Sequence, residues 1–206
     1  VSAENENGEA YTKVNHVPLS SSHLGIVAEV NELSREISAG RVKLEEAEER
    51  LEKIEKIPPK KRWFQYMAAG LASGTFALML GSSVSEAVAA FLIGFLSYVW
   101  VLFAGKHNLS KIIVNIVGGV IMTVLALAFM HIPFLPILKL DGMMVGAIMP
   151  MIPGVAFVNA IRDIADTDFL SGLVRMIDAL LVFVYIAIGV GVTLSIYNTM
   201  MGGILR

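Results

Sequence analysis

Long uncharged stretches dominate the chain after Trp63, and isolated charged residues separate them. The stretches cover residues 63–85, 87–105, 112–138, 142–161 and 179–205. A helix needs about 20 mostly apolar residues to cross a bilayer, and each stretch meets or approaches that length. The pattern predicts an all-α, polytopic membrane protein. We expect five transmembrane helices, at about 64–83, 87–105, 110–131, 142–162 and 174–198.

The first 62 residues are polar and charged, unlike the transmembrane domain predicted over 63–206. Apolar residues recur in this first part at helical spacing, over about 24–39 and again over about 44–57. Gly40 interrupts the first segment, and Pro58 ends the second because proline has no backbone N–H to donate. We therefore expect a water-exposed helical hairpin ahead of the first span. A short strand is also expected within 11–17.

Basic residues at the ends of the spans predict how the chain crosses the membrane. Lys60, Lys61 and Arg62 directly precede the first span, and such clusters stay on the cytoplasmic side. Counting spans from there places four more cations on that side, namely Lys106, Lys111, Arg162 and Arg175. Only Lys139 and Arg206 fall outside. The hairpin is thus predicted to be cytoplasmic and the C-terminus to lie outside.

Composition narrows the class further. The chain is 55% hydrophobic with a formal net charge of −2, which favours neither nucleic acid nor an acidic partner. It has no cysteine, so disulfides and thiolate metal sites are excluded. Residues 1–10 do not resemble a signal peptide. Because the chain begins with Val1, we expect it to start inside a longer gene product, with an incomplete soluble region.

The fourth span contains an unusual backbone. Pro150 and Pro153 remove two backbone donors within four residues, and Gly154 adds flexibility. A broken helix is tolerated in a membrane where neighbouring protein or a wet cavity serves the freed carbonyl groups, and in transporters such breaks border the substrate site. We predict a helix break that acts as a gate. A simple proline kink for packing is the alternative.

Polar residues gather at the predicted cytoplasmic ends of the fourth and fifth spans. Within each span they fall on one helical face: Asn159, Arg162 and Asp163 in the fourth, and Ser171, Arg175 and Asp178 at the start of the fifth. Ionisable groups near a membrane interior are unfavourable unless paired or wetted, which makes them candidates for function. Arginine suits a carboxylate because its guanidinium donates to both oxygens.

We assign substrate binding to Asn159, Arg162, Ser171 and Arg175, and proton coupling to Asp163 and Asp178. The alternative is that both arginines are topology anchors paired with neighbouring aspartates. Elsewhere, two glycine pairs are expected to allow close helix packing, namely Gly70 with Gly74 and Gly142 with Gly146. Glu86, in the tight turn between the first two spans, is expected to be solvated or to cap a helix.

Several segments together resemble the threonine/serine exporter family. They read Pro153-Gly-Val-Ala-Phe-Val-Asn-Ala-Ile-Arg-Asp-Ile, then Ser171-Gly-Leu-Val-Arg, then Asp178-Ala-Leu-Leu. Residues 69–81 and 90–94 resemble the family's first two spans, and 30–35 its cytoplasmic lead-in. The family's Asn-x-x-Arg-Asp pattern maps onto Asn159, Arg162 and Asp163, and its following Ser-Gly and Arg map onto Ser171, Gly172 and Arg175. Asp178 stands where the family has Glu.

The resemblance implies a bacterial inner-membrane exporter of small amino acids or of dicarboxylates such as succinate. It also implies the split form of the family, as in the bacterial succinate exporter, in which a smaller membrane subunit completes the larger one. The expected partners are therefore the lipid bilayer, a small carboxylate substrate, and a second smaller subunit, a homo-oligomer or both. No cofactor, metal or nucleic acid is expected.

Two other function classes remain open at this stage. One is a membrane scaffold or sensor that uses the cytoplasmic hairpin as its interaction surface. The other is an intramembrane enzyme in which Asp163, Asp166 and Asp168 hold a divalent metal. No Gly-rich phosphate loop and no Ser/His/Asp arrangement supports an enzyme, so we expect a transporter.

Overall fold

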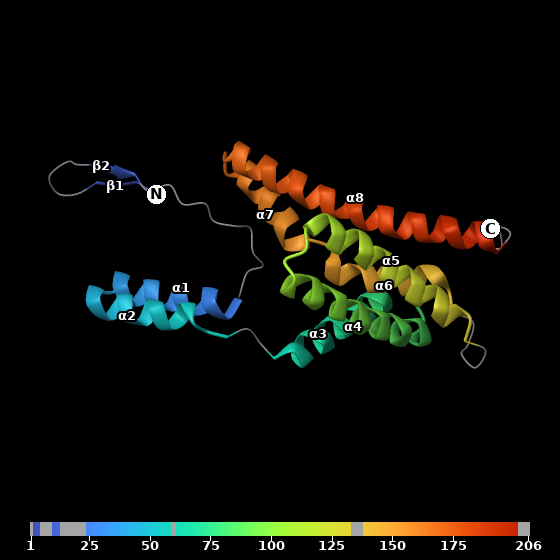
Figure 1. Ribbon diagram of the computed structural model, residues 1–206. Helices are drawn as coiled ribbons and strands as arrows, with labels where there is room; N and C mark the ends of the chain where they lie inside the picture. The colour runs from blue at the N-terminus through green and yellow to red at the C-terminus, as the bar shows by residue number, and fades with distance from the viewer. Residues whose placement is uncertain (1, 5–9, 13–23, 59–60, 133–137, 202–206) are drawn as a thin grey trace. The chain divides into compact units, whose positions relative to one another are not determined.

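The structure is a computed structural model that describes residues 2–4, 10–12, 24–58, 61–132 and 138–201 (Figure 1). The chain divides into two compact units, Val1–Pro59 and Lys60–Arg206. In the first unit, strand β1 (Ser2–Glu4) pairs antiparallel with β2 (Ala10–Thr12). The expected strand over 11–17 begins in β2, and its residues 13–17 lie outside the described residues.

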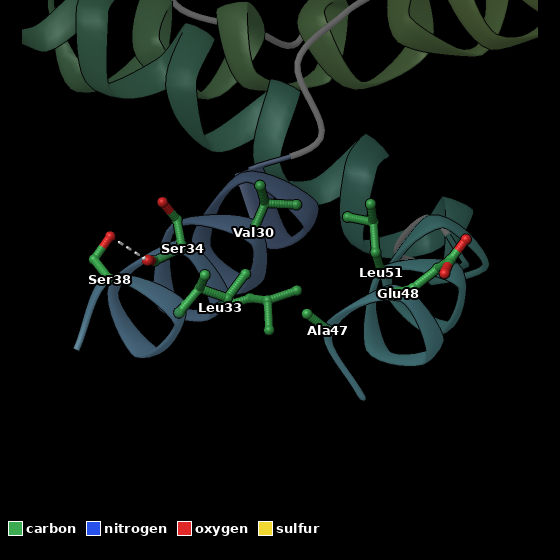
Figure 2. A pocket seen from close by; sticks show the side chains of 8 residues that line it. Val30, Leu33, Ser34, Ser38, Ala47, Glu48 and Leu51 are labelled. Carbon is green, nitrogen blue, oxygen red and sulfur yellow. Dashed lines mark hydrogen bonds between the residues drawn. The ribbon is translucent and has the colours of Figure 1, made fainter. Parts of the chain in front are cut away.

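A two-helix hairpin forms most of the described part of the first unit (Figure 2). Helices α1 (Leu24–Ser38) and α2 (Leu44–Glu55) follow the two segments with helical apolar spacing. Leu33, Ala47 and Ile54 are buried between them, and Arg50 pairs with Glu36 across the hairpin. Gly40 in the connecting turn has a φ of +68°, a conformation that glycine adopts without steric cost.

All the secondary-structure elements described in the second unit are helices. It contains α3 (Arg62–Met79), α4 (Val84–Lys106), α5 (Lys111–Met130), α6 (Leu140–Ile148), the 3₁₀ turn η1 (Met149–Met151), α7 (Gly154–Ala165) and α8 (Phe169–Met200). Within the described ranges, α4, α5 and α8 are long and apolar enough to cross a membrane. The bent pair of α6–η1 and α7 makes a fourth candidate if it is one span.

Five spans were expected, and the structure supports three or four. The remaining helix, α3, overlaps the span expected at 64–83 but is not among the helices that are apolar enough. Arg62 and Gln65 lie in its first turns, and Ser73 and Gly74 lie in its second half. These residues lower its hydropathy because polar and small side chains gain little from transfer into lipid.

Close backbone approaches hold α3, α4 and α6 together. A Cβ on Gly74 of α3 would lie 3.0 Å from the carbonyl oxygen of Ala87 in α4. A Cβ on Gly146 of α6 would lie 2.6 Å from the carbonyl oxygen of Ser73. Gly70 and Gly142 meet Phe91 and Glu86 at similar distances. The predicted packing role of both glycine pairs is confirmed.

Helix α8 runs alongside α5 for most of its length (Figure 1). Gly119 of α5 faces the backbone of α8, since a Cβ there would lie 2.7 Å from the carbonyl oxygen of Ile186. At the far ends of the two helices, the Tyr197 hydroxyl lies 3.1 Å from Nε2 of His131. The two helices therefore run parallel, and their ends are held in register.

Glu86 is a structural residue and is not solvated. Its side chain is only 5% exposed. It forms a capping box with Ser83 at the start of α4, and its second oxygen accepts a hydrogen bond of 2.9 Å from the backbone N–H of Lys139. The expected capping role is confirmed, whereas the expectation of a solvated side chain is wrong. The carboxylate fastens the α3–α4 turn to the entry of α6.

Candidate functional site

The expected break in the fourth span is present. Helix α7 bends by 60° away from the α6–η1 segment. Pro150 lies within η1, and Pro153 occupies the N-cap of α7. The backbone N–H of Gly154 turns back to the carbonyl oxygen of Ile152 at 2.8 Å, a local turn that replaces helical hydrogen bonding. The two prolines therefore lie between two helical segments, α6–η1 and α7.

The two segments have different surroundings. Met143, Met144 and Ala147 of α6 belong to the main apolar core together with residues of α4 and α5. Met151, just before the break, packs onto α5, because a Cβ on Gly118 would lie 2.6 Å from its Cε. Beyond the break, α7 packs mainly against α8. The break thus joins α6, which is packed in the core, to α7, which packs along α8.

A tight turn brings α7 and α8 together as an antiparallel pair. Asp168 caps α8, since its side chain accepts a hydrogen bond from the N–H of Ser171. Gly172 allows contact, because a Cβ there would lie 2.9 Å from the carbonyl oxygen of Ala160. Phe157 and Phe183 meet edge to face further along. Helices α7 and α8 therefore pack closely through small and aromatic residues.

Arg175 and Asp163 form the central contact of this pair. Nη1 of Arg175 lies 2.7 Å from Oδ2 of Asp163, the length of a strong charge-assisted hydrogen bond. Their side chains are 47% and 25% exposed, so water still reaches the guanidinium. The pair joins the two helices that follow the break.

A second ion pair lies about one turn further along α8. Nζ of Lys111 contacts both carboxylate oxygens of Asp178, at 2.9 and 3.3 Å. Lys111 is the first residue of α5, so this pair joins α5 to α8. From the sequence, Lys111 is predicted only to mark the cytoplasmic side. Lys111 and Asp178 were both expected at cytoplasmic helix ends, but nothing in the sequence indicates that the helices which carry them are neighbours.

The other predicted site residues lie at the surface of α7 and at the start of α8. Asn159 is exposed, and so is Arg162, whose Nε is 3.5 Å from Oδ2 of Asp166 on the same helix. An exposed pair of this kind holds its partners weakly. Ser171 is half-buried. The structure therefore brings together Arg175 with Asp163 and leaves Asn159 and Arg162 open to solution.

The three aspartates proposed for a metal enzyme have separate partners. Asp163 pairs with Arg175, Asp166 with Arg162, and Asp168 caps α8. Among the residues that the structure describes, no group of three His, Cys, Asp or Glu side chains is arranged to hold a metal ion. The acidic residues here serve as ion-pair and capping partners.

Comparison with known proteins adds a family. A family model named ThrE, with the description "Putative threonine/serine exporter", matches residues 1–197. This match confirms the resemblance seen in the sequence. No curated protein and no solved structure matches the chain.

Proposed function

The chain belongs to the threonine/serine exporter family, and from this premise we propose that it is a membrane subunit of a secondary exporter for small carboxylate-bearing metabolites. The coarse function, a multi-pass membrane protein of an exporter family, rests on the family match and on the apolar helices. Threonine and serine are the first candidate substrates. Dicarboxylates such as succinate carry the same group that an arginine would bind.

The proposed topology has five spans in the bacterial inner membrane, with α3 as the first. The cytoplasmic side then holds Lys111, Arg175 and their aspartate partners, because both ion pairs lie at one end of the helices. The buried Glu86 and the Tyr197–His131 contact lie at the other end. Parallel packing of α5 and α8 supports this placement, since both helices then run from inside to outside.

The Arg175–Asp163 contact is the observation that carries the proposed site. In this conformation the Asp163 carboxylate binds the guanidinium of Arg175 in the way that a substrate carboxylate would. A substrate that enters from the cytoplasm displaces Asp163 from Arg175 and gains contacts with the exposed Asn159 and Arg162 and with Ser171. The released Asp163 is then free to take up a proton.

Asp178 is the second proposed proton-coupling residue. Its partner Lys111 holds it against the start of α5. A proton on Asp178 would weaken that contact, because a neutral carboxyl attracts an ammonium far less than a carboxylate does. Substrate binding would then weaken the contact between α7 and α8, and proton transfer would weaken the contact between α5 and α8.

The helix break supplies the proposed gate. Segment α6 is fixed in the core, whereas α7 packs mainly on α8, so a pivot at Pro150, Pro153 and Gly154 would move Asp163 relative to the core. Exposed apolar side chains on α7 and α8, including Val155 at 76% and Leu170 at 78%, would face lipid or a partner. A second, smaller membrane subunit, a homo-oligomer or both are the proposed partners.

Reconstitution into liposomes tests this function. The purified chain, with and without a candidate smaller subunit, would be assayed for flux of labelled threonine, serine and succinate under an imposed proton gradient. We expect saturable flux of at least one carboxylate. Its absence for the whole panel, in vesicles that contain both subunits correctly inserted, would refute the exporter proposal.

A further inference from the structure

Two serine hydroxyls in the second unit are buried without a hydrogen-bond partner among the residues that the structure describes. Ser73 of α3 is 0% exposed, and Ser97 of α4 is 3% exposed. Both lie near the middle of their helices, far from the polar helix ends. A buried hydroxyl without a partner destabilises the conformation that contains it, so both residues require an explanation.

Other hydroxyls in this chain are satisfied by a local hydrogen bond. The hydroxyls of Thr123, Thr193 and Thr199 each donate to the carbonyl oxygen four residues earlier, at 2.8–2.9 Å. A serine in the middle of a helix can form the same bond. Ser73 and Ser97 do not form it, so their hydroxyls keep their full capacity to bind another group.

Three helices meet around Ser73 through small residues. A Cβ on Gly94 of α4 would lie 2.0 Å from Oγ of Ser73, and a Cβ on Gly146 of α6 would lie 2.6 Å from its carbonyl oxygen. Ser97 follows Gly94 by three residues and therefore lies on the same face of α4. Pro150, four residues after Gly146, has no N–H to donate to the Gly146 carbonyl group. Polar groups thus gather where α3, α4 and α6 meet, next to the helix break.

A polar hollow opens at one end of the same three helices. It has a volume of about 530 Å³, and its lining includes the buried Glu86 of α4 and Gly142 of α6. Ser82, just after α3, also lines it, and the Ser82 hydroxyl donates to the carbonyl oxygen of Gly142 at 3.3 Å. The contact among these helices therefore has polar groups both in its middle and at the end that the proposed topology places outside.

We propose that the contact among α3, α4 and α6 is the route by which the substrate crosses the membrane, an inference that rests on the exporter function proposed above. In the open state the helices separate at their small residues. The hydroxyls of Ser73 and Ser97 then donate hydrogen bonds to a small carboxylate substrate and to the water that accompanies it. In the closed state the same hydroxyls have no partner, which favours opening. The low hydropathy of α3 suits a helix that lines such a route.

Reaction of single cysteines with a water-soluble reagent tests the route, because the chain has no cysteine of its own. Full-length Ser73→Cys and Ser97→Cys chains in membrane vesicles would be treated with a small charged methanethiosulfonate. Thr123→Cys is the matched control, since Thr123 is also 0% exposed but its hydroxyl already has an acceptor in α5. We expect both route cysteines to react about ten-fold faster than the control, because a side chain that is only buried reacts through rare local opening. Saturating threonine, serine or succinate, whichever is transported, should slow the reaction.

Removal of the hydroxyls gives a second measurement. Ser73→Ala and Ser97→Ala should raise the thermal unfolding midpoint in detergent by a few degrees, because an unpartnered polar group is gone. The same variants should lower flux in proteoliposomes several-fold. Thr123→Val removes a hydroxyl that has a partner, so it should not raise the midpoint and should leave flux unchanged.

Two results would overturn the route and leave the exporter function intact. One is flux by the unsubstituted chain while both route cysteines react no faster than Thr123→Cys. The other is unchanged flux in both alanine variants, which would show that the serines act only as small packing residues. Reaction at both cysteines without flux of any substrate would instead refute the exporter function. Ser97→Cys alone decides the test if the larger sulfur beside Gly94 keeps Ser73→Cys from reaching the membrane.

Discussion

At the residue scale, the two candidate arginines have different environments. Arg175 holds Asp163 across two helices at 2.7 Å, whereas Arg162 contacts Asp166 at 3.5 Å on its own helix and is 78% exposed. The first arrangement fixes a guanidinium in place for a carboxylate. The second arrangement leaves the Arg162 guanidinium free to reach a carboxylate in solution. Both arrangements are consistent with a binding site whose arginines pair with the protein's own aspartates when no substrate is bound.

Replacing Arg175 should affect export strongly. Arg175→Gln removes a charge-assisted hydrogen bond to substrate that contributes about 1.5–3 kcal/mol, so export at low substrate should fall by about 10- to 100-fold. Export by Arg175→Lys should be intermediate, because lysine keeps the positive charge but lacks the planar guanidinium that donates to two oxygens. Initial flux in proteoliposomes measures this. Arg41→Gln, in the hairpin, is the matched control and should leave flux unchanged.

Replacing Arg162 provides a different test. Arg162→Ala breaks only an exposed contact, so insertion and folding should be normal. We expect export to be abolished, because the side chain is proposed to bind substrate. Flux that continues at the original rate, with normal protein levels in the membrane, would remove the α7 face from the site.

At the element scale, sequence periodicity predicted most helices and the break, because both are local properties. The Arg175–Asp163 contact was also within reach, since a short turn joins two helices with polar faces. The Lys111–Asp178 pair and the buried Glu86 contact were not, because they join residues 67 and 53 positions apart. Periodicity gives the face of a helix but not which distant helix it meets. Length and position predicted a span at α3, whereas the hydropathy of α3 is lower than that of α4, α5 and α8.

The pivot at the break can be tested at Gly154. A Cβ there meets no atom within 4 Å, so Gly154→Ala should fold normally. Alanine favours one backbone conformation by about 0.5–1 kcal/mol, and a gate that flexes here should slow by about two- to five-fold. Gly191→Ala in α8, where there is also open space, is the matched control. Equal export by both variants and the unsubstituted chain would argue against a gate at this position.

The Glu86 contact should matter for stability. Glu86→Ala leaves the N–H groups of Ser83 and Lys139 without their acceptor in a partly buried place. Each such loss costs about 1–3 kcal/mol, so the thermal unfolding midpoint in detergent should drop by several degrees. Glu52→Ala on the exposed face of α2 should cause little change. An unchanged midpoint for Glu86→Ala would mean that water replaces the carboxylate.

At the scale of the whole molecule, charge and packing give a consistent orientation. Arg62 and Lys111, the first residues of α3 and α5, lie at the same end of the packed helices as Arg175. The Glu86 and His131 contacts lie at the other end. The family match makes the chain a member of an exporter family, and the carboxylate site at one end of the helices is our proposal for it.

Labelling of single cysteines tests the five-span topology. In intact cells, a membrane-impermeant maleimide should label Lys139→Cys, which lies on the proposed outer side. It should label His107→Cys only after the membrane is permeabilised. Both residues are exposed and lie outside the apolar parts of the spans, so each reports on its side of the membrane. The reverse pattern, or labelling of both in intact cells, would refute the topology.

The central claim is that Asp163 occupies the place of a substrate carboxylate on Arg175. Equilibrium binding of labelled threonine, serine and succinate to the purified chain tests it most directly, with Asp163→Asn and Arg175→Gln compared. The ligand that binds the unsubstituted chain should bind Asp163→Asn about ten-fold more tightly, because an internal competitor is gone, and should lose its affinity for Arg175→Gln. Equal weakening by both substitutions would show that the ion pair only holds α7 to α8 and would contradict the account.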